Sequence, residues 1–147
     1  MRLWRVPLFT RGAWPGHVFL ETPDGCFGWW PCDLDAVNWV LDYFRGRCVP
    51  GEVCRTDEGW IRDGQAREVA RWTLADDALE RLRQSITENQ QGVYQLGNRA
   101  GGRNCVGWAL ERLDDAGVAT SAWPSPQTRG LAPWSVRVGI ASERLGY

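Results

Sequence analysis

The chain has 147 residues, of which 44% are hydrophobic and ten are tryptophan, a composition typical of a folded globular protein. This length predicts a single domain that spans residues 1–147 and has room for a sizeable core. The formal net charge of −1 gives no basic field for nucleic acid, and no stretch approaches the roughly 18 apolar residues of a membrane span. At the N-terminus, arginines and a proline interrupt a short apolar stretch, which does not follow the pattern of a secretory signal peptide.

The N-terminal part of the chain is predicted to form strands. Alternating apolar residues indicate a strand at Leu3–Phe9, with Pro7 favouring the edge of a sheet, and a second strand at Gly16–Glu21. Thr22–Gly25 has the composition of a turn, so Cys26–Trp30 is expected to return as the hairpin partner of the second strand.

Helices and strands alternate in the rest of the chain. Apolar residues at helical spacing predict helices at Asp33–Gly46 and Ala75–Gln90, whereas Arg67–Leu74 and Gly92–Leu96 are expected to be extended. A final strand is predicted at Trp134–Ile140. Together these elements predict an α+β protein built on a small antiparallel sheet.

Cys105 stands at the start of another predicted helix. In the stretch GGRNCVGWALERLDDAGV, residues 101–118, apolar side chains recur at helical spacing after Asn104, a favourable N-cap, and Gly117 ends the pattern. A thiol in the first turn faces unpaired backbone N–H groups and the positive end of the helix dipole, which favour the nucleophilic thiolate and can hold an oxyanion. The position predicts a nucleophile; the alternative is a small apolar filler in the core.

His17 is the only histidine, so it is the only imidazole available to Cys105 as a base. It opens the predicted strand Gly16–Glu21, where its side chain can project from the edge of a sheet. The alternative for a lone histidine is a structural role.

Two segments carry a resemblance to a known group of enzymes. GHVFLETPDGCFGWWP, followed much later by NCVGWALERLDDAGV, resembles the circularly permuted papain-like hydrolases, which include the lecithin:retinol acyltransferase family and relatives of the NlpC-type cell-wall peptidases. The pattern is similar to versions found in bacterial secreted toxin and effector domains, and it covers His17–Pro31 and Tyr94–Val118. The resemblance implies a permuted papain-like fold, in which an antiparallel sheet packs against the helix that bears the nucleophile. It also implies Cys105 as nucleophile and His17 as base, without a metal or a cofactor.

One part of the family pattern is missing from this chain. These enzymes usually orient the histidine with a polar residue on the next strand, but Cys26–Trp30 offers no His, Asn, Gln or Asp. Asp33, just beyond that strand, is the candidate; a backbone carbonyl or no third group at all are the alternatives. For the oxyanion, the resemblance suggests the helix mouth at Cys105 together with Tyr94, although Tyr94 is equally well explained as a buried structural residue.

Four further cysteines form two pairs with C-x5-C spacing: Cys26, Cys32, Cys48 and Cys54. An even set beside the single Cys105 predicts at least one disulfide within the four, with Cys105 left free. The alternatives are a zinc site, although the usual C-x2-C spacing is absent, and four reduced thiols.

Trp29 and Trp30 are adjacent in a predicted strand, so their side chains must face opposite sides of the sheet. We expect one to pack in the core and the other to lie beside the active site.

Three functions are compatible with these features. The first is a cysteine amidase or peptidase, acting on peptidoglycan stem peptides as an antibacterial effector with an immunity protein as a possible partner. Such a protein is made in the bacterial cytoplasm and exported without a cleaved signal peptide; otherwise it is cytoplasmic. The second is a thiol acyltransferase or lipase, which is disfavoured because membrane-directed apolar segments are missing. The third is a non-catalytic binding domain of the same fold.

Overall fold

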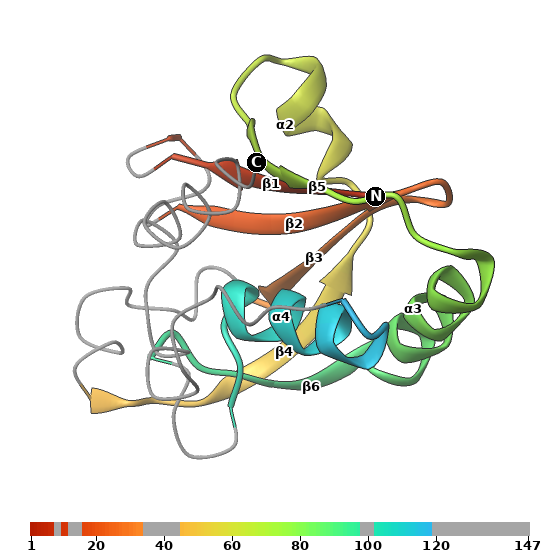
Figure 1. Cartoon of the computed structure of the whole chain (residues 1–147). Helices are drawn as coiled ribbons and strands as arrows, with labels where there is room; N and C mark the ends of the chain where they lie inside the picture. The colour runs from red at the N-terminus through yellow and green to blue at the C-terminus, as the bar shows by residue number, and fades with distance from the viewer. Residues whose placement is uncertain (8–9, 12–15, 34–44, 98–101, 119–147) are drawn as a thin grey trace, which may run out of the picture.

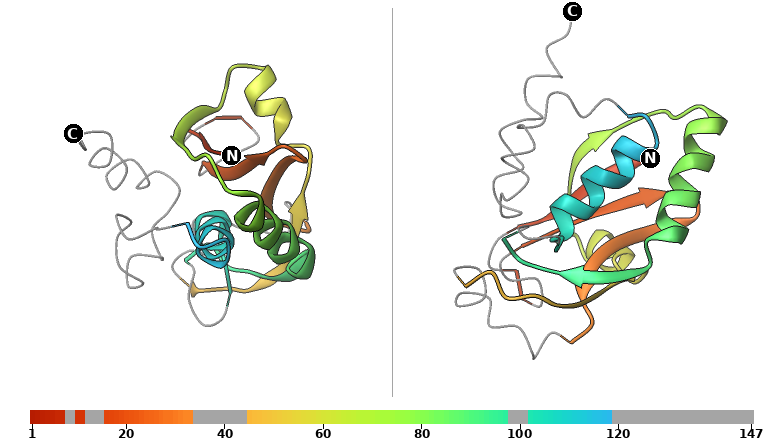
Figure 2. Two further views of the ribbon diagram at one scale, coloured as in Figure 1. Left: turned by 45° about the vertical axis from the view of Figure 1, so that its right-hand side comes forward. Right: turned by 90° about the horizontal axis from the view of Figure 1, so that it is seen from below.

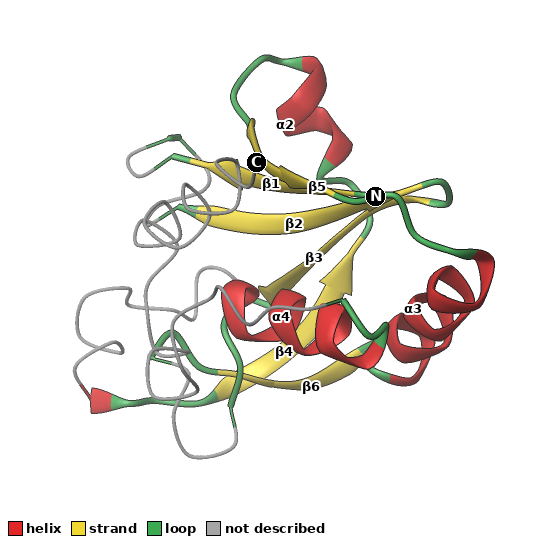
Figure 3. Cartoon of the chain, viewed as in Figure 1, coloured by secondary structure: helices red, strands yellow, loops and turns green. Residues whose placement is uncertain are grey.

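The computed structural model describes residues 1–7, 10–11, 16–33, 45–97 and 102–118 of the chain. These residues form an α+β fold, in which a six-stranded antiparallel sheet has the order β5-β1-β2-β3-β4-β6 (Figure 1). The strands are β1 (Arg2–Val6), β2 (His17–Thr22), β3 (Gly25–Pro31), β4 (Val49–Cys54), β5 (Arg67–Arg71) and β6 (Gln91–Tyr94), and the described helices are α2 (Glu58–Arg62), α3 (Asp76–Glu88) and α4 (Cys105–Asp115) (Figure 3).

The centre of the sheet is the hairpin of β2 and β3, whose register pairs Leu20 with Phe27. A tight turn joins the two strands: the Thr22 hydroxyl accepts a hydrogen bond from the Asp24 N–H at 3.1 Å. Gly25 follows with φ 125°, a conformation that residues with a side chain rarely adopt. The turn and both strands agree with the sequence prediction.

The two faces of the sheet are covered differently. The larger core lies between the sheet and α4, which contacts β2 and β3 and packs against α3 (Figure 2). In this core the rings of Trp29 and Trp108 stack with centroids 6.2 Å apart. The other face carries a smaller apolar cluster around Phe19, against which Trp60 and Ile61 of α2 pack. Successive residues of β2 and β3 therefore serve two separate clusters.

Most of the predicted elements within the described residues are confirmed. The strand at Arg67–Leu74 is shorter than expected, as β5, and the helix at Ala75–Gln90 is α3. The helix predicted for Asp33–Gly46 falls almost entirely on residues 34–44, and this segment and the strand predicted at Trp134–Ile140 lie outside the described residues.

Strand β4 and helix α2 were not predicted from the sequence. Pro50 and Gly51 weaken the strand pattern of β4, because proline lacks an N–H donor and glycine has no side chain to pack. The structure shows why Gly51 is there: a Cβ at this position would lie 2.7 Å from the Trp29 ring. Helix α2 has five residues and none of them is buried, so it leaves no periodic apolar pattern.

Candidate active site

Cys105 is the first residue of α4, as the sequence predicted, and its position is held by the residue before it. Asn104 is completely buried and has extended backbone angles. Its side-chain oxygen accepts a hydrogen bond from the Gly107 N–H at 2.8 Å, and its amide nitrogen donates one to the Leu96 carbonyl at 2.9 Å. The cap therefore starts the helix and also ties its mouth to the chain after β6.

His17, the candidate base, comes from the sheet, whereas Cys105 comes from α4. It is the first residue of β2, where it pairs with Val6 of β1, and only 1% of its surface is exposed. The Cys105 side chain lies close enough to the His17 ring to raise its pKa. The structure thus brings together the two residues that the sequence analysis selected as nucleophile and base.

The second contact of the His17 ring is with Asp57, a residue that the sequence analysis did not select. His17 Nε2 lies 3.2 Å from Asp57 Oδ2, and both side chains are 2% exposed. Asp57 occupies the N-cap position of α2, yet its carboxylate makes no hydrogen bond to that helix. An N-cap aspartate commonly bonds to its own helix; here the carboxylate points at the imidazole instead.

Trp30 covers the same pair of side chains. Its ring lies over that of His17, with centroids 4.0 Å apart and planes tilted by 32°. Its indole N–H donates to Asp57 Oδ1 at 3.1 Å. Trp29, its neighbour, is fully buried in the larger core. The two tryptophans face opposite sides of the sheet, as predicted, since Trp29 belongs to the larger core and Trp30 packs against the smaller cluster.

The surroundings of His17 favour its protonated form. Burial alone lowers the pKa of His17, but the negative charge and hydrogen bond of Asp57, together with the hydrogen bond and charge of Cys105, raise it to about 9. At neutral pH the ring therefore carries a proton between a carboxylate and a sulfur.

Asp33, the sequence candidate for orienting His17, does not occupy the Nε2 side of the ring. It is an exposed residue just after β3, whereas the contact to His17 Nε2 is made by the buried Asp57. Asp57 thus makes the contact that was expected of Asp33, and it satisfies the single hydrogen-bonding position of Nε2. The signal in the sequence was faint: Asp57 follows an unrecognised strand and precedes a helix of only five residues.

Tyr94 ends β6 and is 4% exposed. Burial, and secondarily the charge of Cys105, raise the pKa of the Tyr94 hydroxyl well above its usual range. The hydroxyl is thus neutral, and it lies close enough to Cys105 to be affected by the sulfur's charge. This position is compatible with both readings of Tyr94, the oxyanion donor and the buried structural residue.

The disulfide expected among the four other cysteines is not formed in the structure. All five cysteines of the chain are free thiols: Cys26, Cys32, Cys48, Cys54 and Cys105. Cys26 packs in the small cluster with Val6 and Phe19, and the Cys54 sulfur lies 3.0 Å from the Thr56 hydroxyl. Among the described residues, no three His, Cys, Asp or Glu side chains converge as metal ligands do.

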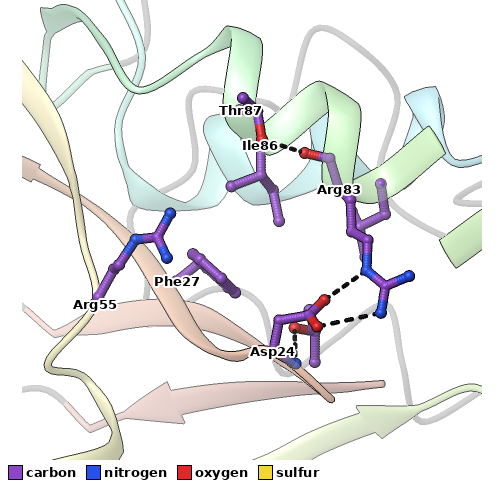
Figure 4. Close-up of a pocket in the computed structure, with 8 residues that line it drawn as sticks. Asp24, Phe27, Arg55, Arg83, Ile86 and Thr87 are labelled. Atoms are coloured by element: carbon purple, nitrogen blue, oxygen red, sulfur yellow. Dashed lines mark hydrogen bonds and ion pairs between the residues drawn. The ribbon is translucent and has the colours of Figure 1, made fainter. Parts of the chain in front are cut away.

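A pocket of about 280 Å³ lies elsewhere, between the β2–β3 turn and α3 (Figure 4). Asp24 and Arg83 form one wall through an ion pair of 2.7 Å, and the Arg55 guanidinium lies 5.0 Å above the Phe27 ring on the other. The residues that line this pocket include neither the candidate nucleophile nor its histidine, so it is separate from the site described above.

No family model, curated protein or solved structure matches this chain. Within the described residues, none of the helices is both long and apolar enough to cross a lipid bilayer.

Proposed function

We propose that this protein is a cysteine hydrolase of the permuted papain-like type, which cleaves amide bonds with Cys105 as nucleophile and His17 as acid and base. The observation that carries the proposal is the chain of contacts from the helix-mouth thiol to the imidazole and on to the Asp57 carboxylate. A nucleophile, a base and a group that orients the base are the parts that covalent acyl transfer requires.

The first half of the reaction forms an acyl-enzyme. The Cys105 sulfur, its proton held by His17, attacks the carbonyl carbon and converts the amide into a tetrahedral intermediate. Backbone N–H groups at the start of α4 stabilise the oxyanion, with the neutral Tyr94 hydroxyl as a further donor. The His17 imidazolium then donates its proton to the departing amine, the C–N bond breaks and a thioester remains on Cys105.

The second half releases the product. His17, now neutral, accepts a proton from a water molecule, which attacks the thioester. The carboxylic acid leaves, and the proton returns to the Cys105–His17 pair. Asp57 stabilises the imidazolium at each stage. It also holds Nε2 in a hydrogen bond, so that the other ring nitrogen exchanges the proton with the Cys105 sulfur.

Substrate has to reach a thiol that is 1% exposed in this structure. The proposed reaction therefore includes a rearrangement that opens the site when substrate binds. The class that fits best is a peptide, and the likeness of the two motifs to effector domains favours peptidoglycan stem peptides. In that setting the protein is an exported antibacterial effector, and an immunity protein is its partner.

The test is release of new amino groups from purified peptidoglycan by the wild type, Cys105→Ala and His17→Ala. We expect each substitution to lower the rate by about 10³-fold or more, because loss of a nucleophile or its base leaves only the oxyanion site. Cys32→Ala is the matched control, since it removes an exposed free thiol from the same chain, and it should keep the wild-type rate.

Parallel assays with a protein substrate and a lipid ester distinguish the related functions. Turnover of the lipid ester alone would assign the protein to the acyltransferase or lipase class. Undiminished activity in Cys105→Ala would contradict the mechanism, and a wild type inert toward every substrate would favour the non-catalytic binding domain.

A further inference from the structure

Gly28 lies on β3 opposite Phe19 of β2, and its side-chain position faces the candidate active site. A Cβ built on Gly28 would overlap Asp57 Oδ2 and would lie 2.5 Å from His17 Nε2. The nearest atoms to this empty position are therefore the two atoms that form the His17–Asp57 contact.

The backbone does not require glycine at this position. Gly28 is not among the glycines with positive φ, and it sits within a regular strand pair. Glycine in a strand interior loses packing and conformational entropy, so its presence there indicates a close approach by another group. Here that group is the Asp57 carboxylate, which enters from the N-terminus of α2.

Trp30, two residues further along the same face of β3, closes the space on its other side. Its indole N–H bonds to Asp57 Oδ1 while the Oδ2 atom meets His17. The carboxylate therefore sits in a socket formed by Gly28 and Trp30. Gly28 leaves room for it because glycine has no side chain, and Trp30 donates a hydrogen bond to it.

We propose that Gly28 is a positioning residue of the active site, which together with Trp30 forms the socket that holds the Asp57 carboxylate against His17. The inference rests on the proposed function, because it assigns the socket a part in the same reaction. It also explains why the strand next to His17 carries no polar residue: the orienting group comes from α2, and β3 supplies the room for it.

The socket controls the charge of His17. The ionisable groups that act on this ring are Asp57, at the N-terminus of α2, and Cys105, at the start of α4. Asp57 also acts, together with Glu21 and Glu58, on the thiol of Cys26. Displacing Asp57 removes the largest influence that raises the pKa of His17 and leaves burial, which lowers it, opposed by Cys105 alone.

Nuclear magnetic resonance of the imidazole tests this directly, because the chain has one histidine and its signals need no assignment by mutation. In Gly28→Ala we expect the pKa of His17 to fall from about 9 to near or below its ordinary value of 6.5. We also expect kcat on peptidoglycan to fall by about 100-fold with little change in KM, as a small misplacement of a catalytic group does. Gly59→Ala in α2 is the control: its Cβ would have no neighbour closer than 3.7 Å, and both readouts should match the wild type.

Asp57→Asn is the second variant, and it keeps the shape of the side chain in case Gly28→Ala does not fold. It should lower the pKa of His17 in the same direction. A folded Gly28→Ala, or a folded Asp57→Asn, whose His17 still titrates at about 9 would overturn the socket. The titration needs no substrate, so a lack of turnover in the wild type would overturn the proposed function instead.

Discussion

The charge of one imidazole depends on two side chains that lie far from it in the sequence. Asp57 and Cys105 hold the proton on His17 against the effect of burial. Trp30 adds a ring over the imidazole and a donor to the carboxylate. A buried carboxylate is stable only when hydrogen bonds and a counter-charge satisfy it, so the indole N–H contributes to stability as well as to orientation.

Trp30→Phe tests the contribution of the indole N–H separately from that of the aromatic ring. It keeps an aromatic side chain but removes one donor from Asp57, which is 2% exposed. We expect the free energy of unfolding to fall by about 1–3 kcal/mol, the usual cost of leaving a buried polar group short of a partner. Urea denaturation of the variant and the wild type measures the difference.

Trp4→Phe is the matched control for this substitution. The Trp4 indole also donates to a carboxylate, that of Glu21 at 2.7 Å, but the Glu21 side chain is 31% exposed and water can replace the donor. Its loss in stability should be smaller. Equal losses in the two variants would show that the indole ring, and not the hydrogen bond to Asp57, accounts for the effect of Trp30→Phe.

At the scale of elements, the site is assembled where β2, α2 and α4 each begin. His17 opens β2, Asp57 precedes α2 and Cys105 opens α4. Of the two helices, α4 is anchored by a large apolar face, since most of its residues are buried, whereas α2 has no buried residue. The proposed nucleophile thus sits on a firmly packed helix, and the carboxylate proposed to orient His17 sits at the start of a lightly packed one.

Asn104→Ala tests how the cap of α4 places the nucleophile. The substitution removes the acceptor for Gly107 and leaves the Leu96 carbonyl without its donor. We expect a loss of about 1–2 kcal/mol from the cap and about 1–3 kcal/mol from the buried carbonyl. Alkylation of Cys105 by iodoacetamide, followed by mass spectrometry, should change in rate because the first turn of α4 is no longer held.

Thr87→Ala in α3 serves as the comparison, because it removes an exposed hydrogen bond of 2.8 Å from a side chain to the helix backbone. It should cost under about 0.5 kcal/mol, as a surface substitution usually does, and leave the alkylation rate unchanged. A wild-type alkylation rate in a folded Asn104→Ala would contradict the role of the cap in placing the thiol.

For the whole molecule, the buried site makes stability depend on pH. The pKa of His17 is raised from its ordinary value of 6.5 to about 9, so the folded state binds a proton more tightly than the unfolded state. The corresponding stabilisation is fully present below about pH 6.5 and is lost as the pH rises through about 9. The buried Cys26 thiol acts at higher pH, because burial raises its pKa from 9.0 to about 11.

Urea unfolding at pH 6.5 and pH 9 measures this loss. We expect the wild type to lose stability across this interval, on the order of a few kcal/mol, because each unit of pKa difference corresponds to about 1.4 kcal/mol. Asp57→Asn should show a much flatter dependence, since it lacks the charge that raises the pKa of His17. Parallel curves for the two proteins would rule out His17 as the source.

The α+β class, the β2–β3 hairpin and the helix that begins at Cys105 could be predicted because each follows from local patterns: alternation, turn residues and a capping residue before an apolar stripe. The Cys105–His17 pair could also be predicted, since the chain has a single histidine and one cysteine at the start of a predicted helix. These features need no knowledge of which strands lie side by side.

Asp57, the third group of the proposed site, was decided by the tertiary structure alone. Asp57 lies against His17 because the sheet order brings the end of β4 beside β3. Gly28 also leaves open the space that a side chain would fill. A glycine inside a strand and an aspartate before a short helix carry little information separately. Their meaning comes from long-range packing, in which an absent side chain on one element is complementary to a carboxylate on another.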